Sequence, residues 1–412
     1  MGSLNSKKYI FYLFLFIFSS TPVFGIDNVS LDESQIEAFK AWLATKRTVT
    51  VKERGGALSL SGDVRVEYIT ANEKKNGFKN IGSNSLHPRI ANDQFDIEFN
   101  MLLDYRTDQT WSTVKVEFDN NMGLIGGTQN RLSLERAFMG FRVFTRDNYT
   151  LDFEFGRRKL NYTFDSRIEF GSFMDGVLFK YNQSADELGD LYIYGGPFVV
   201  NETQDQFALV AELGILNIYN SGVYFKYSII DWDTKDFKKF IDIVRFQYIN
   251  SQFILGYRFL PKYINRVTTL YSAFLINSAA KRYAILNYHL ANLAGYVGFN
   301  IGELRKRGDW SFDTNVQYVE PQAIPEFDFA GIGHGNSDNI GLFTLNLDGT
   351  GGLTTRETAG GKANYVGWRA EFLYLVTDNF TLSQSFKIAR SLHFLPTRYS
   401  YKQYRLELIY AW

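Results

Sequence analysis

The last nine residues of the chain carry a large apolar side chain at every second position. Counted back from the carboxyl end, these residues are Trp412, Tyr410, Leu408, Leu406 and Tyr404. Arg405 and Glu407 lie between them. Because successive side chains of a β-strand point to opposite faces, this segment predicts a strand with one apolar face and one partly charged face. Soluble domains rarely end on such a strand, so the segment indicates a sheet with an apolar environment on one side.

The same period of two begins near Ala57 and continues to the carboxyl end. Leu58, Val64 and Val66 alternate with polar residues in the first segment of this kind. Many polar positions hold charges rather than the Ser and Thr of an ordinary solvated sheet; they are Arg65, Glu67, Asp96, Glu98, Lys115, Glu117, Arg369 and Glu371. A barrel that is apolar outside and encloses a wide, water-filled lumen explains this pattern. We therefore expect these charges to line the lumen wall.

Alternation and turn residues together predict about eighteen strands in one closed antiparallel barrel, an all-β transmembrane fold. The expected ranges are 57–70, 92–106, 110–121, 131–145, 149–158, 175–183, 189–197, 205–216, 220–231, 240–250, 252–260, 265–278, 281–289, 292–302, 308–318, 364–376, 380–391 and 402–412. Fusing 281–289 and 292–302 with their neighbours gives about sixteen strands instead. Both numbers are even, as a barrel with both chain ends on the same side of the membrane requires.

Short and long connections alternate between these strands. The short ones include 107–109, 145–148 and 377–379, and the long ones include 71–91, 160–174 and 319–363. Barrels of bacterial outer membranes have short periplasmic turns and longer external loops. The Gly-rich segment 319–363 would be unusual inside a compact soluble domain, whereas an external loop of a barrel can have this length.

Composition supports a barrel and excludes several other classes. Aromatic residues make up 17% of the chain, yet the mean hydropathy is slightly negative at −0.20, as alternation would produce. The 44 basic residues balance the 44 acidic ones, which argues against a nucleic-acid partner. Cysteine is absent, so the chain can form neither a disulfide nor the lipidated cysteine of a lipoprotein.

The amino-terminal segment has the pattern of a secretory signal peptide. Lys7 and Lys8 precede an apolar run, and small residues follow up to Gly25, which predicts a signal peptide over 1–25. The apolar run is about half of the ~20 residues that a membrane-spanning helix needs. Residues 26–56 are expected to form a periplasmic arm with a short helix over 31–47. This helix lies beside the barrel mouth, or it plugs the pore or contacts another subunit.

Several motifs resemble the Gram-negative general porins. Residues 134–141 contain an Ala-aromatic-x-Gly core, 151–158 end in Phe-Gly-Arg-Arg, and 175–181 open with a small residue and Val after a long loop. Segments 308–312, 318–323 and 376–382 resemble a group of uncharacterised porins. The likeness covers most of the expected barrel, 57–412. The chain departs from the family pattern at Trp412, where Phe is usual, and in a basic run at 157–159, where the family has one Arg.

The resemblance implies where the channel narrows and how the barrel assembles. In the family, the loop that corresponds to 160–174 folds into the lumen and forms the constriction. The candidate constriction residues are Arg157, Arg158, Lys159, Asp165, Arg167 and Glu169. Opposed charges across a narrow pore would orient dipolar solutes and sort ions. If the loop lies outside, its charges are simply solvated. The resemblance also implies that Tyr404, Leu406, Leu408, Tyr410 and Trp412 form the signal read by the barrel-insertion machinery, and that the protein is a homotrimer.

Catalytic and metal-binding patterns are weak. The four histidines are scattered, without metal-ligand spacing, and no Gly-x-Ser-x-Gly elbow is present. We therefore expect no enzymatic activity, no metal and no cofactor.

The sequence thus predicts a porin among the lipids of the bacterial outer membrane. Such a barrel passes ions and small hydrophilic solutes passively. Three alternatives stay open: a substrate-selective channel, a non-conducting adhesin or structural barrel, and a barrel enzyme with a site on its rim. The natural solutes, the pore size and the preferred ion charge are not fixed by alternation.

Overall fold

A computed structural model describes residues 49–53, 56–86, 91–121, 131–146, 148–201, 206–232, 248–282, 289–325, 328–333, 362–393 and 398–412. Its strands are β1 (Val49–Glu53), β2 (Gly56–Lys75), β3 (Phe78–Lys79), β4 (Asp93–Arg106), β5 (Thr110–Asn121), β6 (Arg131–Arg146), β7 (Tyr149–Lys159), β8 (Phe173–Ser184), β9 (Asp190–Asn201), β10 (Gln206–Ile218), β11 (Val223–Trp232), β12 (Tyr248–Phe259), β13 (Thr268–Asn277), β14 (Leu293–Ile301), β15 (Trp310–Val319), β16 (Tyr365–Leu375), β17 (Phe380–Ser391) and β18 (Tyr399–Ala411). The expected signal peptide, the helix over 31–47 and most of 319–363 lie outside the described residues.

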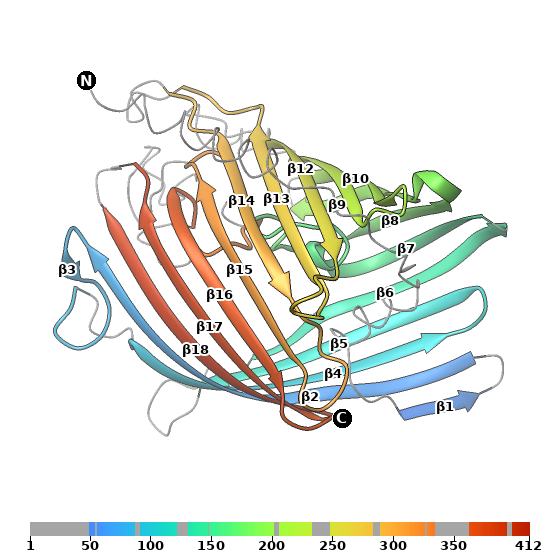
Figure 1. The fold of residues 1–412 in the computed structure, drawn as a ribbon, viewed down its shortest axis with the longest axis horizontal. Coiled ribbons are helices and arrows are strands. Elements are labelled where there is room, and N and C mark those ends of the chain that lie inside the picture. Colours follow the sequence, from blue (N-terminus) through green and yellow to red (C-terminus); the bar gives the residue numbers. More distant parts are fainter. Residues whose placement is uncertain are drawn as a thin grey trace. The chain divides into compact units, whose positions relative to one another are not determined.

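The strands form one closed antiparallel barrel (Figure 1). Sixteen strands make the ring, each paired with its neighbours along the chain, and β18 pairs with β2 to close it. β1 adds a short extra strand on β2, and β3 pairs with the end of β2. The all-β barrel predicted from alternation is confirmed, with the smaller of the two expected strand numbers in the ring.

Two expected strands differ in the structure. Residues 248–259 form a single strand where a break near Ser251 was expected. The polar residues on either side of the expected break, Asn250 and Gln252, point inward and hydrogen-bond to a loop inside the barrel, so the strand continues through them. In 281–289, the described residues 281, 282 and 289 are not in a strand. Lys281 is instead held by a backbone hydrogen bond to the Gln322 side chain.

Short turns gather at one end of the barrel and long connections at the other. The turn after β4 is closed by a hydrogen bond from the Thr107 N–H to the Thr110 carbonyl, at 2.8 Å, and the Thr107 side chain accepts the Thr110 N–H. The same arrangement recurs between Thr377 and Phe380. Both chain ends of the ring, the start of β2 and the end of β18, lie at this short-turn end because β18 is antiparallel to β2.

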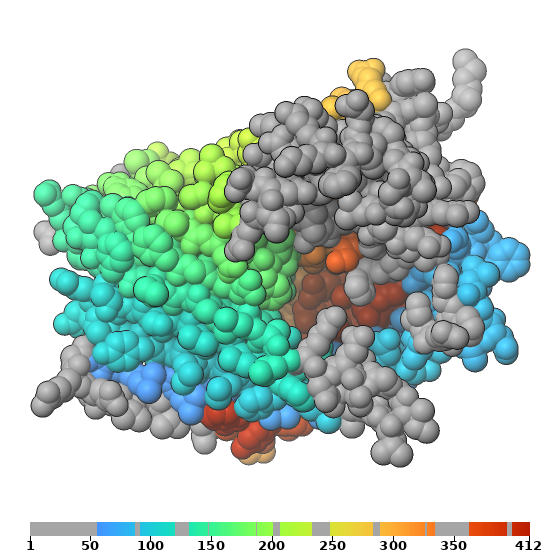
Figure 2. Space-filling model, turned by 180° about the vertical axis from the view of Figure 1, so that it is seen from behind, coloured from blue at the N-terminus to red at the C-terminus, as the bar shows by residue number. Residues whose placement is uncertain are grey.

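The inner face of the barrel is apolar on one side, which alternation did not predict. One apolar cluster lies over β8 to β12 and includes Leu178, Phe198 and Trp232. A second lies over β12 to β18 and includes Leu275, Tyr296 and Tyr365. The first cluster contains residues of the connection that follows β7, and the second contains residues of the connections that follow β7 and β15. The lumen is therefore partly filled by packed loop residues. In Figure 2, orange and red residues of the far wall are visible through a hollow beside the green and cyan strands.

The seam of the barrel joins the end of the chain to its first long strand. Trp412 and Gly62 exchange two backbone hydrogen bonds, at 3.0 and 3.1 Å. Leu408 lies opposite Val66, and Tyr410 lies opposite Val64. These four side chains are all exposed, on the outer face. The predicted apolar face of the last strand is therefore the outside of the barrel.

No helix among the described residues is both long enough and apolar enough to cross a bilayer.

Candidate functional site

The connection from Leu160 to Ser172, here called the inward loop, is packed inside the barrel. It starts with a turn of 3-10 helix, η1 (Leu160–Tyr162), and Thr163 and Phe164 both donate backbone hydrogen bonds to the Leu160 carbonyl. Leu160, Phe164 and Phe170 are completely buried against inward side chains of β8 to β12. The loop thus lies on the inner wall, as the porin resemblance implied.

Polar side chains from across the barrel fix the loop to the wall. The Lys226 ammonium on β11 donates to the Asp165 carboxylate at 2.8 Å. Arg167 reaches Asp313 on β15 at 3.0 Å. Asn250 on β12 donates to the Glu169 carboxyl. Because these partners come from three separate strands, the loop is held along its whole length.

Asp165 and its partner form an ion pair inside the barrel. Burial alone would raise the pKa of Asp165, but the Lys226 ammonium, and more weakly Arg167, hold it below the ordinary value. Asp165 is therefore ionised at neutral pH. A second carboxyl, Glu212 on β10, accepts the Asp165 backbone N–H at 3.0 Å and the Tyr192 hydroxyl at 2.8 Å.

The inward loop is also joined to the segment that follows β15. Residues 320–325 and 328–333, here called the inner segment, lie beside it. The Asp328 carboxylate accepts the backbone N–H groups of Phe170, at 3.1 Å, and Ser172, at 3.2 Å. The Gly171 N–H donates to the Asp328 carbonyl at 2.8 Å. Asp328 is fully buried, so one side chain satisfies two backbone donors that have no access to water.

Two carboxyls are buried together where the loop and the segment meet. Burial raises the pKa of Asp328 to about 7, although hydrogen bonds from Ser172 and from the Phe170 amide oppose the rise. Burial also raises the pKa of Glu169 well above its ordinary value, and the negative charge of Asp328 adds to the effect. Ionisation of either carboxyl disfavours ionisation of the other, because two like charges this close repel each other.

The opposite wall, from β16 through β18 to β5, carries the charges that the sequence predicted for the lumen. They form linked ion pairs rather than isolated charges. The pairs are Arg65 with Asp63 (2.7 Å) and Glu98 (3.4 Å), Arg405 with Glu67 (3.5 Å) and Glu407 (3.2 Å), Lys115 with Glu117 (3.8 Å) and with Glu135, and Arg369 with Glu371 (2.6 Å). Asp96 shares this face, because it lies opposite Glu67 in the register of β2 and β4. We call this surface the charged wall.

The basic run at the end of β7 is split between the two faces of the barrel. Arg158 points inward and is buried, and it forms an ion pair with Glu154 at 2.5 Å. Arg157 shares the face of the exposed Phe155 and binds Asp175 through two hydrogen bonds of 2.8 and 2.9 Å. Lys159 lies on that same outward face, with its ammonium over the Phe173 ring. Of the six candidate constriction residues, the structure therefore brings Arg158, Asp165, Arg167 and Glu169 to the inside.

Sequence reasoning missed the partners that hold the loop. Lys226, Asp313, Glu212 and Asp328 were not singled out. A usable signal was present, because Lys226 and Glu212 interrupt otherwise apolar strands, where an unpaired charge would be costly. Glu154 also accepts the indole N–H of Trp111, at 2.9 Å. Among the described residues, no three acidic or histidine side chains gather as a metal site would require.

Comparison with solved structures finds bacterial barrels. OprB of Pseudomonas putida, in its high-pH structure, aligns over 87% of this chain and 94% of its own, with a TM-score of 0.52 and 9% identity. OmpF of Salmonella typhi, solved with daunomycin, aligns over 88% and 100%, with a TM-score of 0.51 and 12% identity. No family model and no curated protein matches the sequence. These similarities confirm the barrel fold that the motifs implied.

Proposed function

We propose that this protein is a porin of the bacterial outer membrane, which lets ions and small hydrophilic solutes diffuse through its lumen. The observation that carries the proposal is the pairing of a charged wall with an inward loop inside one closed barrel. A bilayer requires every backbone hydrogen bond of a spanning sheet to be satisfied, and the ring meets that requirement by closing on itself. Charges on a lipid-facing surface would be costly, whereas inside a barrel they keep a channel wet.

The proposal places the narrowest part of the channel between the inward loop and the charged wall. The loop occupies the side of β8 to β15, so solutes would pass along β2, β4, β5 and β16 to β18. Several tyrosines also point inward, but Tyr192, Tyr271 and Tyr296 are buried beneath the loop and offer no open rail for sugars. This arrangement favours a channel that selects solutes by their size and charge. We propose no enzymatic reaction.

Assembly follows from the same proposal. The last strand presents its apolar face outward, and we propose that this face is the signal read by the insertion machinery. Association into a homotrimer is likewise part of the proposal.

Single-channel recording tests the function directly. The mature protein, refolded and shown to be heat-modifiable on gels, is added to planar bilayers, and graded sugars are used in a vesicle-swelling assay. We expect stable openings and a sharp size limit for sugar uptake. Correctly folded barrels that never conduct would refute the porin proposal and favour an adhesive, structural or enzymatic barrel.

The sign of the ion preference follows from the charged wall. Acidic side chains outnumber basic ones there: the acids are Asp63, Glu67, Asp96, Glu98, Glu117, Glu135, Glu371 and Glu407, and the bases are Arg65, Lys115, Lys387, Arg369 and Arg405. We therefore expect a preference for cations, because a negative pore wall attracts them at short range.

Neutralising two acids on this wall should reduce the preference. In the double variant Glu98→Gln, Glu117→Gln, the cation-to-anion permeability ratio is expected to fall by roughly twofold or more. Reversal potentials under a salt gradient measure this ratio. Asp108→Asn, in a short turn, serves as the control and should leave it unchanged. An unchanged ratio in the double variant would show that the charged wall does not set selectivity.

A further inference from the structure

A row of cations crosses the outer wall of the barrel near its long-loop end. Strand register places Val366, Arg390, Ser400, Lys74 and Lys79 side by side on five neighbouring segments, β16, β17, β18, β2 and β3. Neighbouring strands are spaced about 4.8 Å apart, so Arg390 and Lys74 stand roughly 10 Å from each other across Ser400. Lys402 lies two residues along β18 from Ser400, on the same face.

These cations face outward and have no acidic partner. Arg390, Lys74 and Lys402 are all exposed. Within the described part of the chain, no carboxylate lies within ion-pair distance of Arg390, Lys74, Lys402 or Arg398. On the charged wall, by contrast, Arg65, Arg369 and Arg405 each lie beside a carboxylate. Exposed cations gathered without a counter-charge indicate a surface that binds an anion.

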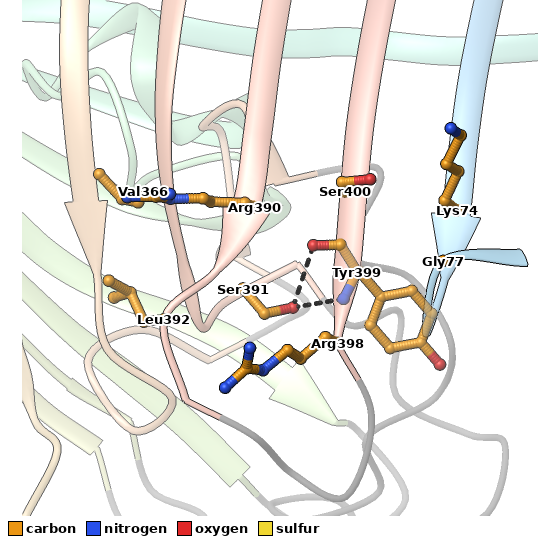
Figure 3. Close-up of a pocket in the computed structure, with 9 residues that line it drawn as sticks. All are labelled: Lys74, Gly77, Val366, Arg390, Ser391, Leu392, Arg398, Tyr399 and Ser400. Carbon is orange, nitrogen blue, oxygen red and sulfur yellow. Dashed lines mark hydrogen bonds between the residues drawn. The ribbon is translucent and has the colours of Figure 1, made fainter.

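A hollow of about 440 Å³ lies among these cations (Figure 3). Lys74, Arg390 and Arg398 line it together with Ser391 and Ser400. Its volume is within the range of about 300–1,000 Å³ that is usual for small-molecule sites. No acidic residue lines it.

The backbone around the hollow is held in place. The Arg398 N–H donates to the Asn76 side chain at 2.9 Å, and the Asn76 N–H donates to the Arg398 carbonyl at 2.8 Å. The Ser391 hydroxyl accepts the Tyr399 N–H at 2.9 Å. Asn76 and Gly77 adopt left-handed conformations that turn the chain tightly beside the hollow. The backbone segments that carry the cations are thus held in place by hydrogen bonds.

We propose that this site binds a phosphate group in the headgroup of an anionic membrane lipid. Arg pairs bidentately with phosphate, and Lys supplies a second positive charge. The next row along the strands toward the short-turn end contains Trp368 and Ile388 beside Lys402. Phe386 packs edge-on against Trp368 below them. A lipid whose phosphate binds the cation row would therefore place its acyl chains against this apolar surface. A free phosphate ion has no acyl chains and would not make that contact. The assignment rests on the proposed membrane location of the barrel.

Binding of short-chain lipids to the detergent-solubilised full chain tests the proposal. Isothermal titration calorimetry compares dihexanoyl phosphatidic acid, dihexanoyl phosphatidylcholine and inorganic phosphate. We expect phosphatidic acid to bind most tightly. The double variant Lys74→Gln, Arg390→Gln should weaken its binding by at least about tenfold, because two charge-assisted contacts are lost.

Two controls keep the result interpretable. Lys262→Gln, Arg307→Gln removes two cations at the short-turn end and should bind phosphatidic acid as the unaltered protein does. Arg390→Lys, which keeps the charge but not the bidentate geometry, should lose less affinity than the double variant. Gel heat-modifiability verifies folding of each variant.

The possible failures are distinct. Inorganic phosphate binding as tightly as phosphatidic acid would overturn the lipid assignment and indicate a free-phosphate site. Equal binding by the double variant and the unaltered protein would overturn the site itself. Neither result depends on conduction, so failure of the porin proposal would be seen separately, as barrels that bind lipid but pass no current.

Discussion

Replacing Asp328 with alanine is expected to release the inward loop from the inner segment. The change leaves the buried N–H groups of Phe170 and Ser172 without their acceptor. Each unsatisfied buried donor costs about 1–3 kcal/mol, so the free energy that holds the loop in its packed position should decrease by roughly 2–6 kcal/mol. The ring of strands does not depend on Asp328 and should still close.

Trypsin provides a direct measurement of this release. Arg167 lies within the inward loop, and in the unaltered protein its ion pair with Asp313 and the packing of Ile168 should protect it. In the Asp328→Ala variant we expect rapid cleavage after Arg167 and, in planar bilayers, noisy currents with variable conductance. Asp108→Ala, in an exposed turn, is the matched control. Equal protection of Arg167 in both variants would show that Asp328 does not hold the loop.

The same contact should weaken as the pH rises. Glu169 and Asp328 have raised pKa values in the folded protein, so the folded state keeps protons that an unfolded chain releases near pH 4. The attachment is therefore strongest below about pH 4 and loses stability as the pH rises through about 7. Trypsin cleavage after Arg167, corrected for the pH dependence of the protease on a peptide, should accelerate between pH 6 and 9. Asp328→Asn should flatten this dependence, and a steep dependence in that variant would contradict the assignment.

Substituting Gly62 with valine is expected to prevent closure of the barrel. A Cβ atom at this position would lie 2.4 Å from the Asn100 carbonyl oxygen and 2.7 Å from Cζ2 of Trp412. The carbonyl belongs to the backbone of β4 and cannot move without breaking the sheet. The substitution therefore disrupts the two hydrogen bonds between Gly62 and Trp412 that end the seam. An open seam exposes unpaired strand edges, which a bilayer does not tolerate.

Gel mobility without boiling separates closed from open barrels. The Gly62→Val variant should run as unfolded chain at all temperatures, with at least about a tenfold loss of heat-modifiable protein. Gly77→Asn is the control, because Gly77 has a φ of +85° with open space around it and asparagine tolerates that conformation. Normal heat-modifiability of Gly62→Val would mean that the seam can shift to accommodate the side chain.

The sequence predicts the walls of this barrel well because alternation is a local signal. Arg65 and Glu67 can be assigned to the lumen from their neighbours alone, and the register of β2 with β18 agrees with that assignment. The break that was expected near Ser251 is absent, because Asn250 and Gln252 on either side of it belong to one continuous strand. Their inward partners, Glu169 and the Asp165 carbonyl, are far away in the sequence.

The candidate site was predictable only in part, for a related reason. Asp165, Arg167 and Glu169 could be named because they lie in one long connection, but their partners come from β11, β15 and β12. The inner face of β8 to β13 is apolar like the outer face, so these strands lack the difference in polarity between the two faces on which alternation depends. Arg157 and Arg158 show what a motif cannot predict. They are neighbours in the sequence, but successive side chains of a strand point to opposite faces, so Arg157 lies outside the barrel and Arg158 inside.

The contact between Asp328 and the Phe170 amide spans 158 residues, which sets an order of events during assembly. Contacts with such a large sequence separation form late because a long stretch of chain must be ordered first. A barrel in which the inner segment is not yet in place would hold an inward loop that is packed against β8 to β12 but not yet bound by Asp328. The width of the passage is thus settled late in folding, when the inner segment packs against the inward loop.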